Sequence, residues 1–390
     1  MEAFLLGLNW IEALMAAVFA FMTLSVTYNL RWTRRLPSLD SLAKAKDLLP
    51  SPVSCSVIIA ARDEAARIEQ TVRHLLAQSG IKLELIVVDD RSTDSSREVL
   101  AQIAQEDARV RVSHVDRLPD GWLGKCHACH TGASAATGDW ILFTDADCWL
   151  KDDAILRALL VAAEARADHI TMTPGVAPGT WPTQAWHLAF LITLADWFAG
   201  VNQDKPGRHL GMGAFNLVKA EVYRSCGGYE TLKLCVLDDI KLGYLINRIG
   251  KRTRAFMGGN DALCHWGGSV RGMIKVMEKN YFAALDYKTS AAMGLGIGGT
   301  IFWGLALAGP FTFTLGGLAA GIGVLSLILP AWILAQRLGW GAGGALLTPF
   351  LFPFLFYAVL RSAILTLWRG GVRWRDTFYP LERLRQAKLP

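Results

Sequence analysis

Two aspartates one residue apart, Asp145 and Asp147, directly follow the apolar run 140–144 (WILFT). This run predicts a buried strand, and in an open α/β sheet ligands bind in the crevice beyond the carboxyl ends of the strands. Carboxylate oxygens at that place can bind Mg²⁺ or Mn²⁺, and the ion in turn binds phosphate oxygens. The pair therefore indicates a site for a divalent cation and a diphosphate. The alternative is an ordinary acidic turn.

Three further acidic motifs support the first interpretation. They are Arg62-Asp63-Glu64, the run 89–94 (DDRSTD), and the pair Asp238-Asp239 after Val236-Leu237. Each has a structural alternative, because Asp and Ser form turns and cap helices, and Asp94 in particular fits a cap. Clustered carboxylates repel one another unless a cation or a hydrogen-bonding ligand lies between them. Four acidic motifs at one edge of a sheet therefore predict a single binding site.

The elements that would position these motifs alternate along the chain. Short apolar runs predict strands, and runs with apolar residues on one helical face predict helices. The strands are expected at 54–60, 83–88, 110–112 and 140–144, and the helices around 68–76, 98–104 and 127–136. This alternation predicts an α/β fold, a parallel sheet with helices on both faces.

Both ends of the chain have the composition of membrane segments. The protein has 390 residues, of which 52% are hydrophobic. Residues 4–28 carry one charge, Glu12, and are long enough to span a bilayer. Arg31, Arg34 and Arg35 follow the apolar run instead of preceding it, which favours an uncleaved anchor over a signal peptide. The positive-inside rule then places the chain from residue 31 onward in the cytoplasm.

Residues 291–366 form the second apolar block, with breaks at Gly309-Pro310 and between Gln336 and Gly344. Two or three crossings fit this block. The basic residues that follow favour a cytoplasmic tail, which requires an even number of crossings. A re-entrant or interfacial segment at 291–309 would reconcile three apolar segments with such a tail.

These patterns predict a multi-pass protein of the cytoplasmic (inner) membrane whose catalytic domain faces the cytoplasm. The predicted parts are an anchor at 1–30, a basic juxtamembrane linker at 31–50, a catalytic domain at 51–286, membrane helices at 291–366 and a basic tail at 367–390.

Charge and cysteines exclude other classes of protein. The net charge of +6 is diffuse, with no basic cluster interleaved with aromatics in the middle region, which argues against a nucleic-acid partner. The seven cysteines are scattered over a domain expected in the cytoplasm, so most of them are expected to be free thiols. Cys126, Cys129 and His130 match a haem-attachment pattern, but no second ligand cluster accompanies them.

The apolar stretch Ala185 to Gly200 is too short for a span and contains His187 and Asp196. It predicts a helix in the membrane interface or in the protein core. In the interfacial case it would guide an acceptor in from the membrane through six apolar side chains: Trp186, Leu188, Phe190, Leu191, Trp197 and Phe198.

The order of motifs resembles that of the family 2 glycosyltransferases. The motifs are SVIIAARDEA, LIVVDDRSTD, GWLGK, LFTDAD, GGY and LDD, and the resemblance covers about residues 54–285. With membrane segments on both sides, the chain looks most like the ceramide-glucosyltransferase-like branch. Within that branch it looks closest to the bacterial members associated with hopanoid biosynthesis and to those of carotenoid pathways. The resemblance implies a nucleotide-diphospho-sugar transferase (GT-A, Rossmann-like) fold.

The resemblance also implies roles for single residues. Asp145 and Asp147 would form the D-x-D site for Mg²⁺ or Mn²⁺, and Asp239 would be the general base that deprotonates the acceptor hydroxyl. Gly124 would lie near the sugar-nucleotide. The nucleotide-sugar would contact Ala60, Arg62, Glu64, Asp89, Asp90, Lys125 and Asp145. On the acceptor and diphosphate side the candidates are Asp238, His265, Arg271, Lys275 and Lys279.

Two departures from the family pattern bear on the reaction. Processive polysaccharide synthases of this superfamily carry Q-x-x-R-W after the base, and this sequence has no such pentad. Arg271, Lys275 and Lys279 occupy that position, with the spacing of one helical face. The stretch 374–379 (WRDTFY) resembles a C-terminal W-[KR]-G-R-x-Y element but lacks its Gly and second Arg.

The expected function is an inverting, metal-dependent transfer of a single sugar from a nucleotide-sugar, a UDP-sugar, to a membrane lipid such as a hopanoid, carotenoid or sphingolipid-like acceptor. Two alternatives remain open. One is a processive polysaccharide synthase, which the missing pentad disfavours. The other is a non-catalytic membrane protein that binds or transports a lipid, which does not need a base opposite a metal site.

Overall fold

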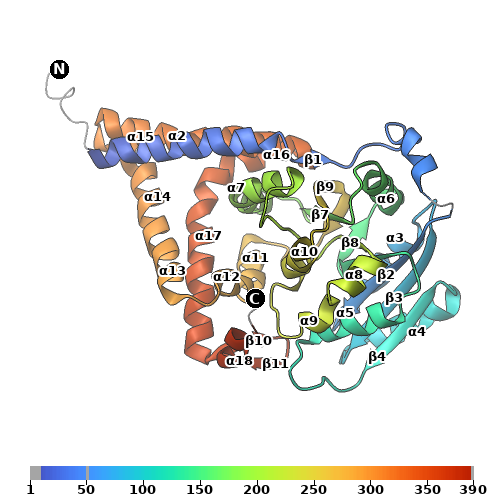
Figure 1. Cartoon of the computed structure of the whole chain (residues 1–390). Helices are drawn as coiled ribbons and strands as arrows, with labels where there is room; N and C mark the ends of the chain where they lie inside the picture. The colour runs from blue at the N-terminus through green and yellow to red at the C-terminus, as the bar shows by residue number, and fades with distance from the viewer. Residues whose placement is uncertain (1–9, 50–51, 388–390) are drawn as a thin grey trace. The chain divides into compact units, whose positions relative to one another are not determined.

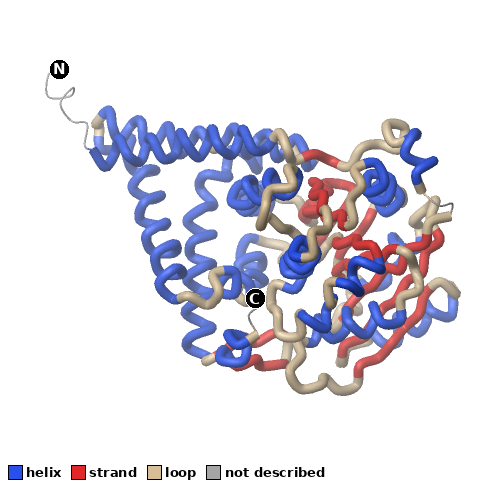
Figure 2. The backbone as a smooth tube through the Cα atoms, in the orientation of Figure 1, coloured by secondary structure: helices blue, strands red, loops and turns tan. Residues whose placement is uncertain are grey.

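The computed structural model describes residues 10–49 and 52–387, and the first nine residues of the predicted anchor lie outside this range. The chain forms two compact units. One, here called the sheet unit, comprises Thr33–Gly175 and Gly200–His265 with the last residues from Gln386. The other, the helical unit, comprises the N-terminal residues to Trp32, then Val176–Ala199 and Trp266–Arg385. Figure 2 shows that the long strands gather in the sheet unit. Neither unit is one contiguous stretch of the chain, and the expected catalytic domain at 51–286 stays a prediction.

Within the residues that the structure describes, the helical unit holds four helical segments that are long and apolar enough to cross a membrane. They are α2 (Trp10–Leu30), Thr289–Thr312, Leu315–Leu338 and α17 (Ala342–Arg369). The second segment joins α13 (Thr289–Met293), η2 (Gly294–Gly298), α14 (Gly299–Ala308) and η3 (Gly309–Thr312), and the third joins α15 (Leu315–Ser326) and α16 (Ile328–Leu338). Three apolar segments thus follow His265. The gap between the last two lies inside the predicted break from Gln336 to Gly344, whereas the gap between the first two lies at residues 313–314, just after the predicted break at Gly309-Pro310.

Helix α2 lies beside α15 in the helical unit (Figure 1). Gly323 permits this approach, because a side chain there would press on Phe19 of α2. Polar groups pair across the contact: the hydroxyls of Thr23 and Ser326 lie 2.6 Å apart, and Thr314 donates to the Glu12 carboxylate at 2.8 Å. The one charge of the first apolar run therefore has a hydrogen-bonding partner between the helices.

The central sheet is mixed, and this corrects the expectation of a parallel sheet. Its strand order is β1-β9-β7-β8-β5-β2-β3-β4, with β6 paired to β9. Strands β4, β3, β2 and β5 are parallel, as the alternating strands and helices predicted, but β8 runs antiparallel to both β5 and β7. The strands are β1 (Arg34–Arg35), β2 (Ser54–Ala61), β3 (Lys82–Asp90), β4 (Val110–Val115), β5 (Trp140–Asp145), β6 (Cys148–Leu150), β7 (His169–Val176), β8 (Asn216–Lys219) and β9 (Thr253–Cys264).

All seven strands and helices expected between residues 54 and 144 are present. The remaining elements of the chain complete the two units. They are η1 (Ala43–Leu48), α3 (Ile68–Leu76), α4 (Ser96–Glu106), α5 (Gly124–Ala135), α6 (Ala154–Glu164), α7 (Trp181–Asn202), α8 (Ala220–Ser225), α9 (Gly228–Thr231), α10 (Asp238–Arg248), α11 (Val270–Met277), α12 (Asn280–Ala284), the hairpin β10 (Gly371–Trp374) and β11 (Thr377–Pro380), and α18 (Leu381–Gln386).

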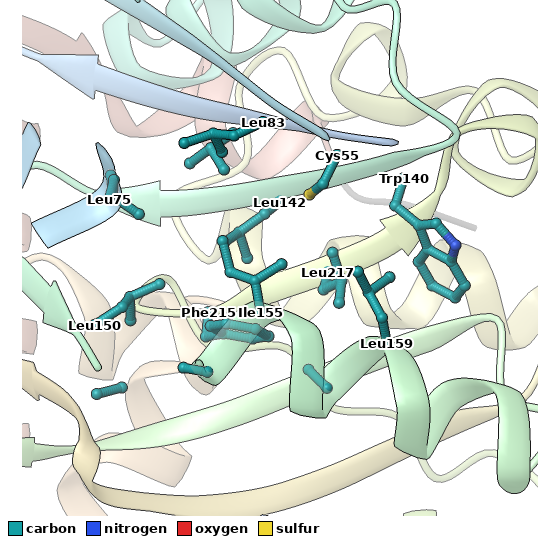
Figure 3. Packing of buried hydrophobic residues seen from close by; sticks show 14 of the residues in the cluster. Cys55, Leu75, Leu83, Trp140, Leu142, Leu150, Ile155, Leu159, Phe215 and Leu217 are labelled. Atoms are coloured by element: carbon teal, nitrogen blue, oxygen red, sulfur yellow. The ribbon is translucent and has the colours of Figure 1, made fainter. Parts of the chain in front are cut away.

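Helices cover both faces of the parallel strands, which explains why β2 is almost continuously apolar. On one face, alternate residues of the strands pack with α3, α4 and α6 in the largest core cluster, in which Leu142, Ile155 and Phe215 are seen together in Figure 3. On the other face, Ile86 and Val88 pack against Ala128 of α5. The two layers fix the strand ends that carry the acidic motifs.

Helix α7 contains the stretch that was expected to lie in the interface or in the core. Of its six candidate interfacial side chains, Trp186, Leu188, Leu191 and Phe198 are buried. In addition, a Cβ at Gly344 of α17 would meet the side chain of Gln184, so α7 packs closely on α17. The structure therefore favours a core helix of the helical unit over an interfacial one.

We expect the double substitution Leu191→Lys with Phe198→Glu to prevent folding. Both positions are almost completely buried, at 1% and 0% exposure, and an unpaired charge buried there costs several kcal/mol. Thermal unfolding of the detergent-solubilised protein measures this effect. Thr193→Lys, on the exposed side of the same helix, is the control and should unfold like the wild type. A double variant as stable as wild type would restore the interfacial interpretation.

Candidate active site

The register of the parallel strands brings three acidic motifs to one edge of the sheet. Strand β2 lies between β3 and β5, with Ala61 paired to Asp89 and Ala60 paired to Asp145. The carboxyl ends of parallel strands meet at the same edge. Ala60, Asp89 and Asp145, which were assigned to one nucleotide-sugar site, are thus neighbours across the sheet.

The loops that follow β2 and β3 are tied together by hydrogen bonds. The backbone N–H of Asp63 donates to the Ser92 hydroxyl at 3.0 Å, and that of Glu64 donates to the Ser96 hydroxyl at 2.9 Å. Asp94 accepts from the Ala65 N–H at 3.0 Å and from the Ser96 N–H at the same distance. Asp94 therefore holds the two loops together, and the N-cap position of α4 belongs to Ser95. The loop containing Arg62 and Glu64 is fixed beside the end of β3.

Asp89 and Asp90 both have protein partners. The Asp89 carboxylate is fully buried and contacts Arg97 at 3.1 Å and His114 at 3.2 Å. Burial alone would raise the pKa of Asp89, but its hydrogen bonds with Ser92, His114 and Arg97 lower it below the ordinary value. Asp90 pairs with Arg91 at 2.8 Å. A side chain at Gly124 would overlap the Asp90 carboxylate, so only glycine allows the start of α5 to approach it.

Lys125, on the first turn of α5, joins two of the acidic motifs. Its ammonium lies 2.6 Å from the Asp145 carboxylate and 3.8 Å from that of Asp238. Burial alone would lower the pKa of Lys125, but Asp145 and Asp238 raise it well above its ordinary value. Tyr229, the tyrosine of the GGY motif, donates to Asp238 at 3.1 Å. Lys125 is therefore a fixed positive charge at the site where a diphosphate is expected.

Asp238 and Asp239 begin helix α10 and do not follow a strand, which corrects the sequence-based grouping of all four motifs with strand ends. The two Asp239 oxygens accept from the backbone N–H groups of Gly213 and Ile240, each at 2.8 Å. A side chain at Gly213 would lie 2.6 Å from an Asp145 oxygen. Asp239 and Asp145 therefore lie on either side of Gly213.

Burial, followed by the negative charge of Asp238, raises the pKa of Asp239 to about 6, although Lys125 opposes this. A carboxyl group with such a pKa is ionised at neutral pH and accepts a proton more readily than an ordinary aspartate. These are the properties of a general base.

Asp147 completes the D-x-D motif and meets a requirement of a cation site. Burial and then the charge of Asp145 raise its pKa above the ordinary value. A divalent cation between the two carboxylates would relieve this repulsion, and carboxylate oxygens are the donors that Mg²⁺ and Mn²⁺ prefer. His265 contacts the backbone of Asp147. Its N–H donates to the Asp147 carbonyl at 3.2 Å, and its Nδ1 lies 3.4 Å from that oxygen.

The three basic candidates for the diphosphate lie in the helical unit and not on one helix. Arg271 and Lys275 are on α11, whereas Lys279 lies beyond the end of that helix. The Lys279 ammonium lies 3.1 Å from the centre of the Trp374 ring, a cation–π contact within the helical unit. The expectation of one shared helical face is therefore wrong for Lys279.

The motif that resembles a haem-attachment site lies on helix α5, with its two cysteines buried. Cys126 and Cys129 are buried free thiols, and His130 lies 3.6 Å from the Glu230 carboxylate. Within residues 10–49 and 52–387, no group of three metal-ligating atoms forms around this motif.

The sequence analysis missed a different group of possible metal ligands. Asp147, Cys148 and Cys264 have ligand atoms that all lie within 4.8 Å of one another. Only the adjacency of Cys148 to the D-x-D motif hinted at it.

Comparison with known proteins agrees with this geometry. The mixed α/β sheet is that of the GT-A nucleotide-sugar transferases, and the structure is similar to the mannosyltransferase PcManGT from Pyrobaculum calidifontis in complex with GDP-Man and Mn²⁺. The TM-score is 0.51, with 18% identity over 92% of this chain and all of that one. Residues 56–227 match the model of the family "Glycosyl transferase family 2". Residues 56–227 are therefore similar to a family 2 glycosyltransferase domain.

Two similar curated proteins have names that mention lipid-like molecules. The chain is 27% identical over 208 residues to the 4,4'-diaponeurosporenoate glycosyltransferase of Staphylococcus haemolyticus, covering 50% of this chain and 52% of the relative. It is 22% identical over 204 residues to the beta-monoglucosyldiacylglycerol synthase of a Nostoc strain, covering 52% and 43%. The chain thus spans about half the length of the curated relatives it matches. The family match ends before Asp238, so it does not test the expected role of Asp239.

The pKa of Asp239 predicts an acid limit to catalysis. A general base acts only when ionised, so the rate should be constant above neutral pH and fall as the pH drops through about 6. One pH unit below that pKa, kcat/KM should be about tenfold lower. Initial rates between pH 5 and 8 test this. Because the pKa of Asp147 is also raised, metal saturation must be verified at each pH. A flat profile over this range would exclude Asp239 as the base.

Proposed function

We propose that this protein transfers a single sugar, with inversion, from a UDP-sugar to a lipid acceptor in the bilayer, in a reaction that requires Mg²⁺ or Mn²⁺. The observation that carries the proposal is the arrangement around Lys125. This half-buried cation lies between Asp145 of the D-x-D motif and Asp238, and the pKa of the neighbouring Asp239 is raised to about 6.

The proposed roles follow from the charges. Asp145 and Asp147 would hold the metal ion, which when bound would neutralise charge on the departing diphosphate. Lys125 would bind a phosphate oxygen as a point charge. Asp239 would take the proton of the acceptor hydroxyl while that oxygen attacks the sugar from the face opposite the diphosphate, which inverts the anomeric carbon. The loops carrying Arg62, Glu64 and Asp90 would bind the nucleotide.

Two observations support a lipid acceptor. The described part of the chain has four helical segments apolar enough to span a membrane, three of them after Asp239. Two of its relatives are named for transfer to a carotenoid acid and for synthesis of a glucosyldiacylglycerol. We therefore propose a hopanoid, carotenoid, glycerolipid or sphingolipid-like acceptor. The arginines at 31, 34 and 35 favour a cytoplasmic site in the inner membrane.

The test is to incubate membranes that contain the protein with a panel of labelled UDP- and GDP-sugars in the presence of Mg²⁺ or Mn²⁺. Label from one UDP-sugar should enter the organic phase, as a lipid that carries one sugar. Membranes with the Asp239→Asn variant are the control and should incorporate almost none. A labelled product of many sugars would favour a processive synthase, and absence of transfer from any donor would favour a lipid-binding protein.

A further inference from the structure

The antiparallel pairing of β6 with β9 brings two cysteines together beside the D-x-D motif. Cys148 and Cys264 are direct partners in this ladder, so their side chains project from the same face of the sheet. Their sulfurs lie 3.9 Å and 3.5 Å from one oxygen of Asp147. Both cysteines are buried free thiols, and Asp147 is partly exposed. The cluster therefore offers two sulfur ligands and one oxygen ligand, which an ion can reach from the Asp147 side.

These distances suit a tetrahedral soft-metal ion. With zinc–sulfur bonds of about 2.3 Å and a zinc–oxygen bond of about 2.0 Å, the sulfur-to-oxygen edge of a tetrahedron is about 3.5 Å. The two observed separations lie at or slightly above this value. Thiolate ligands select Zn²⁺ and similar ions, whereas Mg²⁺ and Mn²⁺ prefer oxygen.

Neighbouring groups hold the cluster in place. Cys148 and Cys264 are fixed by the strand ladder, and the Asp147 carbonyl accepts from the backbone N–H of His265. The His265 ring packs against Trp149 with ring centroids 4.0 Å apart, and both residues follow the cysteines in sequence. Successive side chains of a strand alternate between faces, so the Trp149 ring lies on the face of β6 opposite to Cys148.

We propose that Asp147, Cys148 and Cys264 bind a thiophilic divalent cation such as Zn²⁺, and that this ion inhibits the enzyme because it takes Asp147 from the D-x-D site. Two metal–sulfur bonds and one metal–oxygen bond form, the two thiol protons pass to solvent, and nothing is oxidised. The binding site stands by itself, whereas the inhibition rests on the proposed transferase function.

Binding is tested on the full-length, detergent-solubilised protein with Cd²⁺ as the probe, in a phosphine reductant that keeps the thiols reduced. A thiolate-to-metal charge-transfer band should appear at one equivalent of Cd²⁺. In Cys148→Ser and Cys264→Ser the apparent dissociation constant should rise at least about tenfold, since loss even of a supporting group costs that much. Cys226→Ser, a buried cysteine at the end of α8, is the matched control and should bind like the wild type. No band, or an undiminished band in both serine variants, would overturn the site.

Inhibition is tested by transfer rates at saturating Mg²⁺. Zn²⁺ should inhibit the wild type and the Cys226→Ser control, and Cys148→Ser should need at least about tenfold more Zn²⁺ for the same inhibition. Full activity of wild type with the ion bound would overturn the competition for Asp147. A band that depends on both cysteines in a protein without any transferase activity would support the metal site and reject the proposed function.

Discussion

Replacing Asp239 by asparagine is expected to lower the rate of sugar transfer by about 10²–10⁴-fold, the usual contribution of a general base. The substitution removes the group that accepts the proton but leaves the D-x-D motif and Lys125 in place. Donor binding should therefore be nearly unchanged. Single-turnover rates and equilibrium binding of the nucleotide-sugar, measured on the same preparation, separate the two effects.

The matched control is Asp116→Asn, an exposed aspartate on the loop after β4, which should transfer sugar at the wild-type rate. Loss of donor affinity together with rate would make Asp239 a binding residue, since its oxygens also order the backbone at Gly213. In that case its neighbour Asp238 would be the next candidate for the base.

The second large effect is expected for Asp147→Asn. The metal ion would lose one of its two carboxylate ligands where charge develops on the leaving diphosphate, an interaction worth several kcal/mol. The transfer rate should fall at least about 10²-fold, since each 1.36 kcal/mol is a factor of ten. Removal of the metal by EDTA should abolish wild-type transfer, and added Mg²⁺ or Mn²⁺ should restore it.

Thermal unfolding distinguishes this effect from damage to the fold. The pKa of Asp147 is raised by burial and by Asp145, so loss of its charge relieves repulsion and should not destabilise the metal-free protein. Transfer that persists in EDTA, together with an active Asp147→Asn variant, would reject the metal-dependent mechanism. Lys125, already 2.6 Å from Asp145, would then be the residue that balances the phosphate charge.

Local sequence patterns were sufficient for the part of the fold in which neighbours in sequence are neighbours in space. The strand and helix positions from residue 54 to 144 were predicted because each element carries its own periodicity. Strand β8 was not predicted, and its antiparallel direction could not have been, because an apolar run is the same in either direction. The place of Asp238 at a helix start was missed for a similar reason: Val236-Leu237 is too short to reveal its structure.

In the candidate site, too, the residues with a local sequence signal were predicted and those that meet only in the folded chain were not. Asp145 and Asp147 were found because two carboxylates after an apolar run form a local signal. The contact of Lys125 with both Asp145 and Asp238 depends on the approach of α5 and α10 in the folded chain, which no spacing encodes. Cys148 and Cys264 lie far apart in sequence and meet only through the β6–β9 ladder.

The two compact units have a practical consequence for dissecting the protein. The chain leaves the sheet unit after Gly175 and returns at Gly200, and helix α7 contains most of the intervening segment. Asp147 lies before this excursion and Asp239 lies after it. Every uninterrupted fragment that contains both carboxylates therefore also contains α7, whose buried Trp186 and Phe198 belong to the helical unit. Cutting away the flanking apolar segments would expose these side chains to water, so a soluble catalytic fragment requires redesign of α7 as well as truncation.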